Sequence, residues 1–346
     1  MDIFLLRLDR IGDFILGIPA YRALREAHPH DRISVVVPSA AAELARSCPY
    51  FDEVYVFEAR WLMPGEKPRV RWRSAWQLIH FLRPKRVDLL INFRYQNRLD
   101  PLVTGLSGAK KSVGFDHGFW SRFLTTAVPQ PLPGTHQVRR NLLPLEALGI
   151  RTHDLSLGMW WDERDEKRAL EHLPRQESLP GLPRLGIHLG AATPAKRWGE
   201  EDFAALIHEL QAATEGEILV FGGEEDLPFA HEVLDGLKAP VVNLVGKLTL
   251  RQMASLIAGC RAFVGCDTGP THLAAAVGTP VVSLFSAANE AAVWKPWGEK
   301  VKVLTRQPSC SPCQSYACRR TDGYFCMREI KVEEVVEAVK GFLAPR

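Results

Sequence analysis

Short apolar segments alternate with helical segments along these 346 residues, and the alternation runs through the chain twice. The apolar segments are continuous and rich in β-branched residues, which is typical of strands buried in parallel sheets. The first series covers 3–8, 33–37, 54–57 and 87–92, and the second covers 185–189, 217–221, 241–245, 262–265 and 281–285. Helical segments separate them at 14–27, 76–82, 201–213, 250–258 and 271–277. The pattern predicts an α/β fold with parallel sheets and right-handed crossovers.

The chain is long enough for two domains, each with its own core. Residues 160–183 are charged and then rich in proline and glycine, which is typical of a linker. We therefore expect one domain over 1–165, a hinge over 166–183 and a second domain over 184–346. Two such domains joined by one hinge predict a deep cleft between them, where a ligand would bind.

The composition is that of an ordinary globular protein, with 46% hydrophobic residues, 24% charged residues and a formal net charge of +3. The longest apolar runs fall short of the 18 residues that a membrane span needs. The N-terminus lacks the basic and apolar regions of a secretory signal. We expect the protein to stay in the cytoplasm.

The most informative motif follows the segment 262–265, where the chain reads Cys-Asp-Thr-Gly-Pro-Thr-His-Leu over residues 266–273. In an open α/β sheet such a corner presents unpaired helix N–H groups that suit an anion such as a diphosphate. Gly269 allows close approach, Thr268 can donate a hydrogen bond and Asp267 can accept one from a sugar hydroxyl. An Asx-type turn that caps an ordinary helix explains the same residues equally well.

Gly12 and Asp13 follow the first strand, and only one glycine of a dinucleotide fingerprint is present there. The carboxylate of Asp13 would stabilise the start of the next helix. The alternative is that it faces the cleft and takes a proton from an incoming hydroxyl. Spacing alone favours the helix-capping role.

Two further loops follow strands of the second half. Residues 190–198 read Gly-Ala-Ala-Thr-Pro-Ala-Lys-Arg-Trp, so that small residues precede Lys196 and Arg197. This pairing favours anion binding over two solvated surface cations. Residues 221–226 read Phe-Gly-Gly-Glu-Glu-Asp, which fits either binding of a ribose or adenine group or a turn that caps the next helix.

Four of the seven cysteines lie close together, at Cys310, Cys313, Cys318 and Cys326. Four thiolates could form a structural site for zinc or iron, although their intervals are irregular for a zinc ribbon. Free thiols are the alternative. Cys48, Cys260 and Cys266 have the character of buried small residues.

The segment 60–86 carries eight cations, among them Arg60, Arg71 and Arg73, against the single anion Glu66. Trp61, Trp72 and Trp76 are interleaved with them. Such a surface suits a phosphorylated acceptor or an anionic membrane face. No nucleic-acid-binding motif accompanies it, so we expect no nucleic-acid partner.

Taken in order, these motifs resemble glycosyltransferase family 9, the lipopolysaccharide heptosyltransferases. The resemblance covers nearly the whole chain and rests on the residues 10–13, 16–20, 195–198 and 267–273, and on the late cysteine run that ends in Cys-Met at 326–327. It implies a GT-B fold with two Rossmann-like domains, in which a last helix at 331–344 packs back on the first. It also implies catalysis without a metal, with transfer of a heptose from an ADP-sugar to the phosphorylated inner core of lipopolysaccharide.

The resemblance also implies roles for individual residues. Asp13 matches the general base and Lys196 the residue that contacts the donor phosphates. The expected donor-binding residues are Gly190, Thr193, Lys196, Arg197, Gly222, Glu224, Glu225, Asp267, Thr268, Gly269 and His272. The expected acceptor-binding residues are Arg10, Gly12, Arg60, Arg71 and Arg73.

Other functions remain open on the sequence. A sugar-nucleotide epimerase or hydrolase would use similar phosphate contacts without an acceptor. A member of the same family could use another sugar donor or a protein acceptor. A non-enzymatic module that binds nucleic acid or protein through the cysteines and the basic segment is a further alternative, which predicts salt-sensitive binding.

Overall fold

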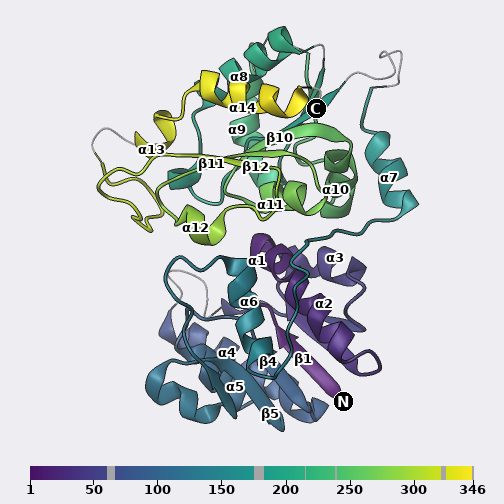
Figure 1. The fold of residues 1–346 in the computed structure, drawn as a ribbon, viewed down its shortest axis with the longest axis vertical. Helices are drawn as coiled ribbons and strands as arrows, with labels where there is room; N and C mark the ends of the chain where they lie inside the picture. Colours follow the sequence, from purple (N-terminus) through teal and green to yellow (C-terminus); the bar gives the residue numbers. More distant parts are fainter. Residues whose placement is uncertain (61–66, 175–182, 215, 238–239, 321–324, 345–346) are drawn as a thin grey trace. The chain divides into compact units, whose positions relative to one another are not determined.

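The computed structural model describes residues 1–60, 67–174, 183–214, 216–237, 240–320 and 325–344 (Figure 1). The chain divides into two compact units, Met1–Ser156 (unit 1) and Leu157–Arg346 (unit 2). Trp61 and Glu66, which were counted in the basic segment, lie outside the described residues. No helix among the described residues is long and apolar enough to cross a membrane.

Unit 1 is a parallel sheet with helices, and its strands are paired in the order β3-β2-β1-β4-β5-β6. The strands are β1 (Asp2–Leu6), β2 (Arg32–Val37), β3 (Glu53–Val56), β4 (Leu89–Asn92), β5 (Lys111–Phe115) and β6 (Thr126–Val128). The helices are α1 (Ile11–Leu16), α2 (Ile18–Ala27), α3 (Ser39–Ser47), α4 (Pro68–Leu82), α5 (Leu99–Gly105) and α6 (Gln137–Glu146).

Unit 2 has the same plan, with strands paired in the order β12-β11-β10-β7-β8-β9. The strands are β7 (Arg184–His188), β8 (Glu217–Phe221), β9 (Val242–Asn243), β10 (Cys260–Cys266), β11 (Val281–Phe285) and β12 (Val301–Thr305). The helices are α7 (Glu163–Leu170), α8 (Glu200–Ala213), α9 (Leu227–Leu234), α10 (Leu250–Ala258), α11 (Gly269–Ala276), α12 (Ala291–Trp294), α13 (Phe325–Arg328) and α14 (Val332–Leu343).

Both sheets therefore have the doubly wound Rossmann order, and every strand pair in them is parallel. The strand order reverses between β1 and β4 in unit 1 and between β7 and β10 in unit 2. Ligands of open α/β sheets bind at the carboxyl ends of the strands at this point. The motifs around Asp13, Lys196 and Asp267 all follow one of these four strands.

The predicted alternation of strands and helices is confirmed, with two kinds of difference. The strands β5, β6 and β12 were not predicted, because they are short or carry lysine and glycine that weaken an apolar pattern. The predicted helix at 14–27 is two helices, α1 and α2, which meet at Gly17. A side chain on Gly17 would lie 2.2 Å from the hydroxyl of Tyr21, so this position requires glycine.

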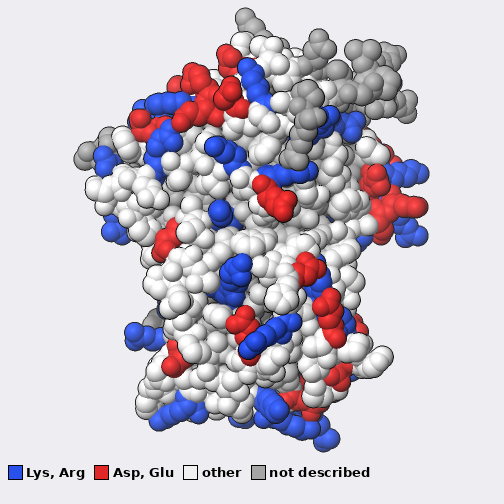
Figure 2. All heavy atoms as spheres, in the orientation of Figure 1, with Lys and Arg blue, Asp and Glu red and all other residues white. Residues whose placement is uncertain are grey.

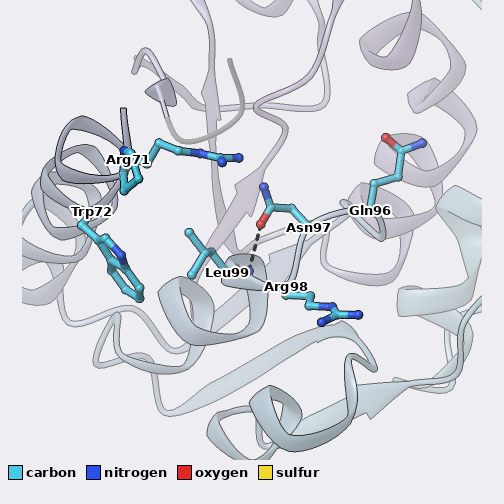
Figure 3. A pocket seen from close by; sticks show the side chains of 7 residues that line it. Arg71, Trp72, Gln96, Asn97, Arg98 and Leu99 are labelled. Carbon is cyan, nitrogen blue, oxygen red and sulfur yellow. Dashed lines mark hydrogen bonds between the residues drawn. The ribbon is translucent and has the colours of Figure 1, made fainter. Parts of the chain in front are cut away.

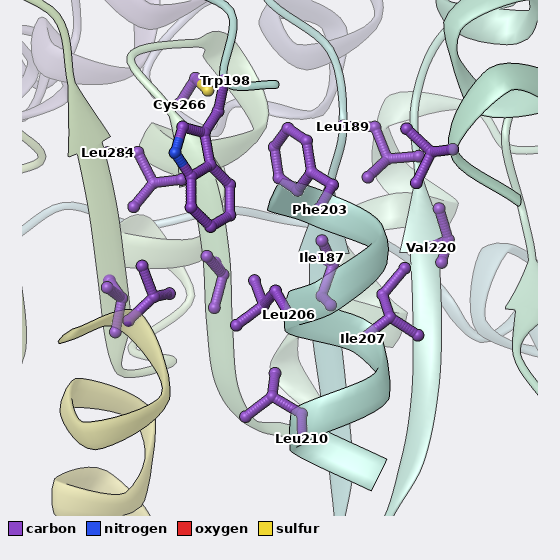
Figure 4. Close-up of a cluster of buried hydrophobic side chains, with 14 of the residues drawn as sticks. Ile187, Leu189, Trp198, Phe203, Leu206, Ile207, Leu210, Val220, Cys266 and Leu284 are labelled. Carbon is purple, nitrogen blue, oxygen red and sulfur yellow. The ribbon is translucent and has the colours of Figure 1, made fainter. Parts of the chain in front are cut away.

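The core of unit 2 lies between helix α8 and the sheet (Figure 4). Phe203, Leu206 and Leu210 of α8 pack there against strand residues such as Ile187 and Val220. Helix α14 contributes Val335, Val336 and Val339 to the same core and contacts α8, β10 and β11. The apolar face of α14 thus packs within unit 2, and the expected contact of this helix with the first domain stays a prediction.

The start of unit 2 differs from the expected hinge. Asp162 and Asp165, at the N-terminus of α7, both form ion pairs with Arg251 of α10, the first at 3.1 Å. Helix α7 therefore belongs to unit 2, and the border between the compact units comes before the expected border after residue 165. Of the predicted hinge, residues 175–182 lie outside the described residues.

Candidate functional site

A buried ion pair lies at the carboxyl ends of β7 and β10 in unit 2. The Lys196 Nζ donates a hydrogen bond to Asp267 Oδ2 at 2.6 Å. The Asn289 Nδ2 donates to the same oxygen at 2.8 Å, and His272 Nε2 lies 3.8 Å from Asp267 Oδ1. Lys196 and Asp267 are both more than nine-tenths buried. Residues from three loops and one helix thus converge on a single carboxylate.

The charge of Asp267 is fixed by these contacts. Burial by itself would raise the pKa of this carboxyl group, but His272 and Lys196 lower it from 3.8 to about 2. The carboxylate is therefore ionised at neutral pH. A buried lysine with such a partner stays in one place, which preorganises the cation for an incoming anion.

The helix α11 begins directly beside this pair. Thr268 is its N-cap residue and Gly269 its first residue, so its unpaired N–H groups lie where the motif predicted them. The Thr268 hydroxyl is hydrogen-bonded to Thr271 Oγ1 at 3.2 Å and to His188 Nδ1 at 3.3 Å. The Thr268 side chain makes no capping hydrogen bond to α11, so the loop is held by contacts inside the fold and not by the helix cap that the sequence allowed.

His188 and Asp226 belong to this site, and the sequence reasoning missed both. His188 ends the buried strand β7, and its Nε2 lies 3.6 Å from Asp226 Oδ2. Burial acts to raise the pKa of Asp226, but His188, the Gly223 N–H and Arg197 together lower it. The sequence signal that could have identified His188 is its place at the carboxyl end of an apolar strand.

At two of the expected glycines, Asp226 occupies the space that a side chain would need. A side chain on Gly190 would lie 2.4 Å from the Asp226 carboxylate, and one on Gly222 would lie 3.0 Å from its Cβ. Glu224 and Glu225, the acidic residues expected to bind the donor, are exposed on a 3-10 turn. The loop therefore has one buried carboxylate and two that face solvent.

Three polar groups around the pair lack a hydrogen-bond partner within the described part of the chain. They are Thr193 Oγ1, Arg197 Nε and His272 Nδ1, and all three atoms are buried. The guanidinium of Arg197 lies over the ring of Phe229, 4.7 Å from its centroid. Buried polar atoms are nearly always satisfied, so these groups indicate a place for a ligand.

In unit 1, Asp13 is the third residue of α1 and is partly exposed. Its Oδ2 accepts a hydrogen bond from the backbone N–H of Arg10 at 3.3 Å, which is the capping contact considered for it. Its carbonyl oxygen accepts a hydrogen bond from Arg7 Nη2 at 2.8 Å. The backbone of Asp13 is thus fixed by a buried arginine, while its carboxylate caps a helix of only six residues.

Arg7, directly after β1, connects this helix to α2 and α6, and through Asp9 to the loop after β4. Its other contacts are Tyr21 OH at 3.0 Å, Asn141 Oδ1 at 2.7 Å and Asp9 Oδ2 at 3.2 Å. The other oxygen of Asp9 pairs with Arg94, whose Nε also lies 3.3 Å from Asp100 Oδ2. This chain of charges at the point where the strand order reverses was not predicted, because its members are far apart in sequence.

A cavity of about 390 Å³ lies between α4 and the start of α5 in unit 1. It is lined by Pro68, Arg71, Trp72, Gln96, Asn97, Arg98 and Leu99. Figure 3 shows the Arg71 and Asn97 side chains pointing toward one another, with Asn97 Oδ1 accepting a hydrogen bond from the Leu99 N–H at 2.9 Å. Two arginines and an indole in one pocket suit an anionic sugar.

Of the five expected acceptor-binding residues, one lines this cavity and four do not. Arg71 lines the cavity, whereas Arg10, Gly12, Arg60 and Arg73 are not part of its lining. Arg98, which does line it, was not predicted. On the face drawn in Figure 2, basic and acidic side chains are interspersed.

The four late cysteines share one neighbourhood. The partly buried thiol of Cys326 has a raised pKa, mainly through burial, and Cys318, Cys313 and Cys310 raise it further. Among the described residues, no three His, Cys, Asp or Glu side chains are arranged to hold a metal ion. Metal binding by this cluster therefore stays a prediction. Cys48, Cys260 and Cys266 are buried, as expected.

Two Rossmann-like units in one chain are the architecture of the GT-B fold. The solved structure of E. coli ADP-heptose lps heptosyltransferase II supports that fold. It has a TM-score of 0.75 and 23% identity, covering 99% of this chain and 98% of that one.

The family model "Glycosyltransferase family 9 (heptosyltransferase)" matches residues 75–322. The chain is 29% identical over 296 residues to lipopolysaccharide heptosyltransferase 3 of Escherichia coli, covering 84% of each chain. It is 30% identical over 352 residues to lipooligosaccharide heptosyltransferase 2 of Campylobacter jejuni, covering all of both. The chain belongs to glycosyltransferase family 9, the heptosyltransferase family.

Proposed function

We propose that this enzyme transfers a heptose from an ADP-activated donor to the phosphorylated inner core of lipopolysaccharide, with inversion at the anomeric carbon. The observation that carries the proposal is the buried Lys196–Asp267 pair beside the N-terminus of α11. Near it lie three buried polar atoms that have no hydrogen-bond partner among the described residues. The E. coli heptosyltransferase II, which has the same fold and is named for ADP-heptose, supports an ADP-heptose donor.

In this proposal the donor diphosphate binds to unit 2. Lys196 and Arg197 offset the charge that develops on the leaving diphosphate, and the N–H groups near Thr268 and Gly269 bind its oxygens. Thr193 donates a further hydrogen bond. Asp267 accepts one from a sugar hydroxyl, and His272 assists it. The loop with Gly222, Glu224 and Glu225 contacts the adenosine, and Gly190 leaves room for the Asp226 carboxylate of that loop.

The acceptor hydroxyl is activated by unit 1. Asp13 removes the hydroxyl proton as the acceptor oxygen attacks the anomeric carbon of the heptose. A bond forms between these two atoms while the bond from the anomeric carbon to the diphosphate oxygen breaks. The proton remains on the Asp13 carboxylate, and the electron pair leaves with ADP. A single displacement inverts the configuration and requires no covalent intermediate.

The acceptor phosphates bind near the basic surface of unit 1. We assign Arg71 and Arg98 to this role because they line the cavity of about 390 Å³. Arg10, Gly12, Arg60 and Arg73 remain proposed contacts outside it. The exposed Trp72 and Trp76 of α4, beside Arg73, suit peripheral contact with the anionic cytoplasmic face of the inner membrane, where a lipid-anchored acceptor would be present.

No catalytic step in this proposal depends on a metal. The four late cysteines have the soft donor set that zinc or iron prefers. Their side chains in this structure are not arranged as a closed site, so we keep a bound metal as a separate prediction, tested by metal analysis of the purified protein.

Product analysis with a labelled donor tests the proposed function. Labelled ADP-heptose is incubated with the enzyme and with a truncated lipopolysaccharide that lacks the heptose to be added. We expect the label in the lipid-bound product and no transfer from UDP-sugars. Free sugar or epimerised ADP-sugar in place of that product would mean a hydrolase or an epimerase instead.

A further inference from the structure

The cysteine-bearing segment forms main-chain contacts with two loops of the donor site. The N–H of Ala195 donates a hydrogen bond to the carbonyl oxygen of Tyr316 at 3.2 Å. The N–H groups of Cys313 and Gln314 donate to the carbonyl oxygens of Ala287 and Ala288, each at 3.1 Å. Residues 313–316 therefore bridge the loop around 195 and the loop around 288.

These two loops carry the two side chains that hold Asp267. Lys196 directly follows Ala195, and Asn289 directly follows Ala288. Both side chains donate to the same oxygen of Asp267, at 2.6 Å and 2.8 Å. A shift of residues 313–316 would thus move both donors at once.

The thiol of Cys326 contacts one of the two bridged loops. The sulfur of Cys326 interacts with the backbone of Ala287, the same residue that accepts the hydrogen bond from Cys313. The thiols of Cys310, Cys313 and Cys318 lie near enough to Cys326 to influence its charge. Cys326 is followed by Met327, which is buried in the core of unit 2.

We propose that residues 313–316 are a positioning element for the donor-phosphate site, anchored by the thiol cluster of Cys310, Cys313, Cys318 and Cys326. When a thiol of this cluster adds across the C=C bond of an electrophile such as a maleimide, an S–C bond forms and the thiol proton moves to the neighbouring carbon. The adduct displaces Lys196 and Asn289 and weakens binding of the nucleoside diphosphate. The inference rests on the proposed function, because it assigns regulation to the same donor site.

The first test changes the backbone contact and leaves the thiols intact. Gln314 is exposed and has a positive φ of 49°, so Gln314→Pro removes its N–H and cannot adopt this conformation. Gln314→Gly keeps the N–H and tolerates the conformation, which makes it the matched control. We expect Gln314→Pro to weaken ADP binding roughly tenfold or more, the loss for one weakened charge-assisted hydrogen bond, and Gln314→Gly to leave it unchanged.

The second test changes the thiols. The protein is treated with a chelator and then with N-ethylmaleimide, until mass spectrometry shows adducts on the late cysteines. Cys48, Cys260 and Cys266 are buried, and burial raises the pKa of each thiol to about 12, so they should stay unmodified. We expect weaker ADP binding by calorimetry, with transfer recovered when the donor is raised to saturation and an unchanged KM for the acceptor.

The outcomes separate the two proposals. ADP affinity that is unchanged in Gln314→Pro, or in the alkylated protein, overturns the inference while the proposed function stands. A failure of the unmodified protein to bind ADP overturns the proposed function and the inference with it. Circular dichroism of each sample checks that the fold is retained, and loss of affinity through global unfolding also counts against the positioning role.

Discussion

The two units have the same strand order but different chemistry where that order reverses. In unit 2 this point carries a buried lysine, aspartate and asparagine beside the N-terminus of an eight-residue helix. In unit 1 it carries Arg7, Asp9 and Arg94 beside a helix of only six residues. The same fold therefore presents a buried ion pair beside a helix N-terminus in one unit and a network of paired charges in the other.

The difference has a physical meaning for the ligands. A buried site whose cation is held by a carboxylate, which Asn289 holds in turn, suits one invariant group, such as a diphosphate. The basic pocket of unit 1 is lined by side chains from a helix surface and a loop, which suits a larger and more variable acceptor. The predictions below test this division, beginning with the largest expected effect.

The base in unit 1 should affect turnover alone. Asp13→Asn removes the proton acceptor and should lower kcat by roughly 10²–10⁴-fold, the usual contribution of a general base. Steady-state transfer assays measure this effect. The exposed Glu26 on α2 supplies the control, since Glu26→Gln should keep full activity. Full turnover in Asp13→Asn would leave this residue with its helix-capping role only.

The buried pair in unit 2 should affect stability as well as donor binding. Lys196→Met leaves the Asp267 carboxylate buried without its cation, which should cost about 3–5 kcal/mol in the free energy of unfolding. Urea denaturation measures it. The exposed Lys302 on β12 offers a matched control, because Lys302→Met should change stability by no more than about 0.5 kcal/mol. Equal effects of the two variants would show that the pair is not buried as described.

Stability in acid should depend on Asp267. Its pKa is about 2 in the fold against 3.8 as the reference value, so its contribution is complete above pH 4 and is lost as the pH falls toward 2. The contribution is on the order of 2 kcal/mol. Unfolding free energies of the wild type and Asp267→Asn should therefore converge over this range. A constant gap would contradict the lowered pKa; Asp235→Asn, at an exposed site, should show no such convergence.

The cavity in unit 1 should distinguish two arginines of the same helix. Arg71→Ala should raise the KM for a phosphorylated acceptor about tenfold, since a hydrogen bond to a charged group contributes about 1.5 kcal/mol. Arg73→Ala, outside the cavity lining, should have a smaller effect. Kinetics at two salt concentrations test both, because added salt should reduce the difference. An equal change in both variants would assign acceptor binding to the basic surface as a whole.

Local patterns in the sequence predicted the parts of the structure that depend on neighbouring residues. The continuous apolar strands and the motif from Asp267 to His272 are of this kind, because a strand, its loop and the next helix follow one another. Lys196 was also found this way, since the small residues before it mark a loop beside a strand. The helix at 14–27 was predicted as one element because nothing local shows that Tyr21 packs against Gly17.

Contacts between distant residues had no such signal. Arg7 and Asn141 are 134 residues apart, and no pattern around either shows that they are hydrogen-bonded. Arg98 lines the cavity only because the loop after β4 lies beside α4. Among the acidic residues of the loop after β8, sequence favoured Glu224 and Glu225, whereas burial beside Gly190 singles out Asp226.

An ADP titration by calorimetry tests the division between the two units most directly, with the wild type, Asp13→Asn and Lys196→Met compared under one set of conditions. We predict that Asp13→Asn binds ADP as tightly as the wild type and that Lys196→Met binds it at least about tenfold more weakly, because only the latter loses a charged phosphate contact. Unchanged affinity in Lys196→Met, or weakened affinity in Asp13→Asn, would contradict the account.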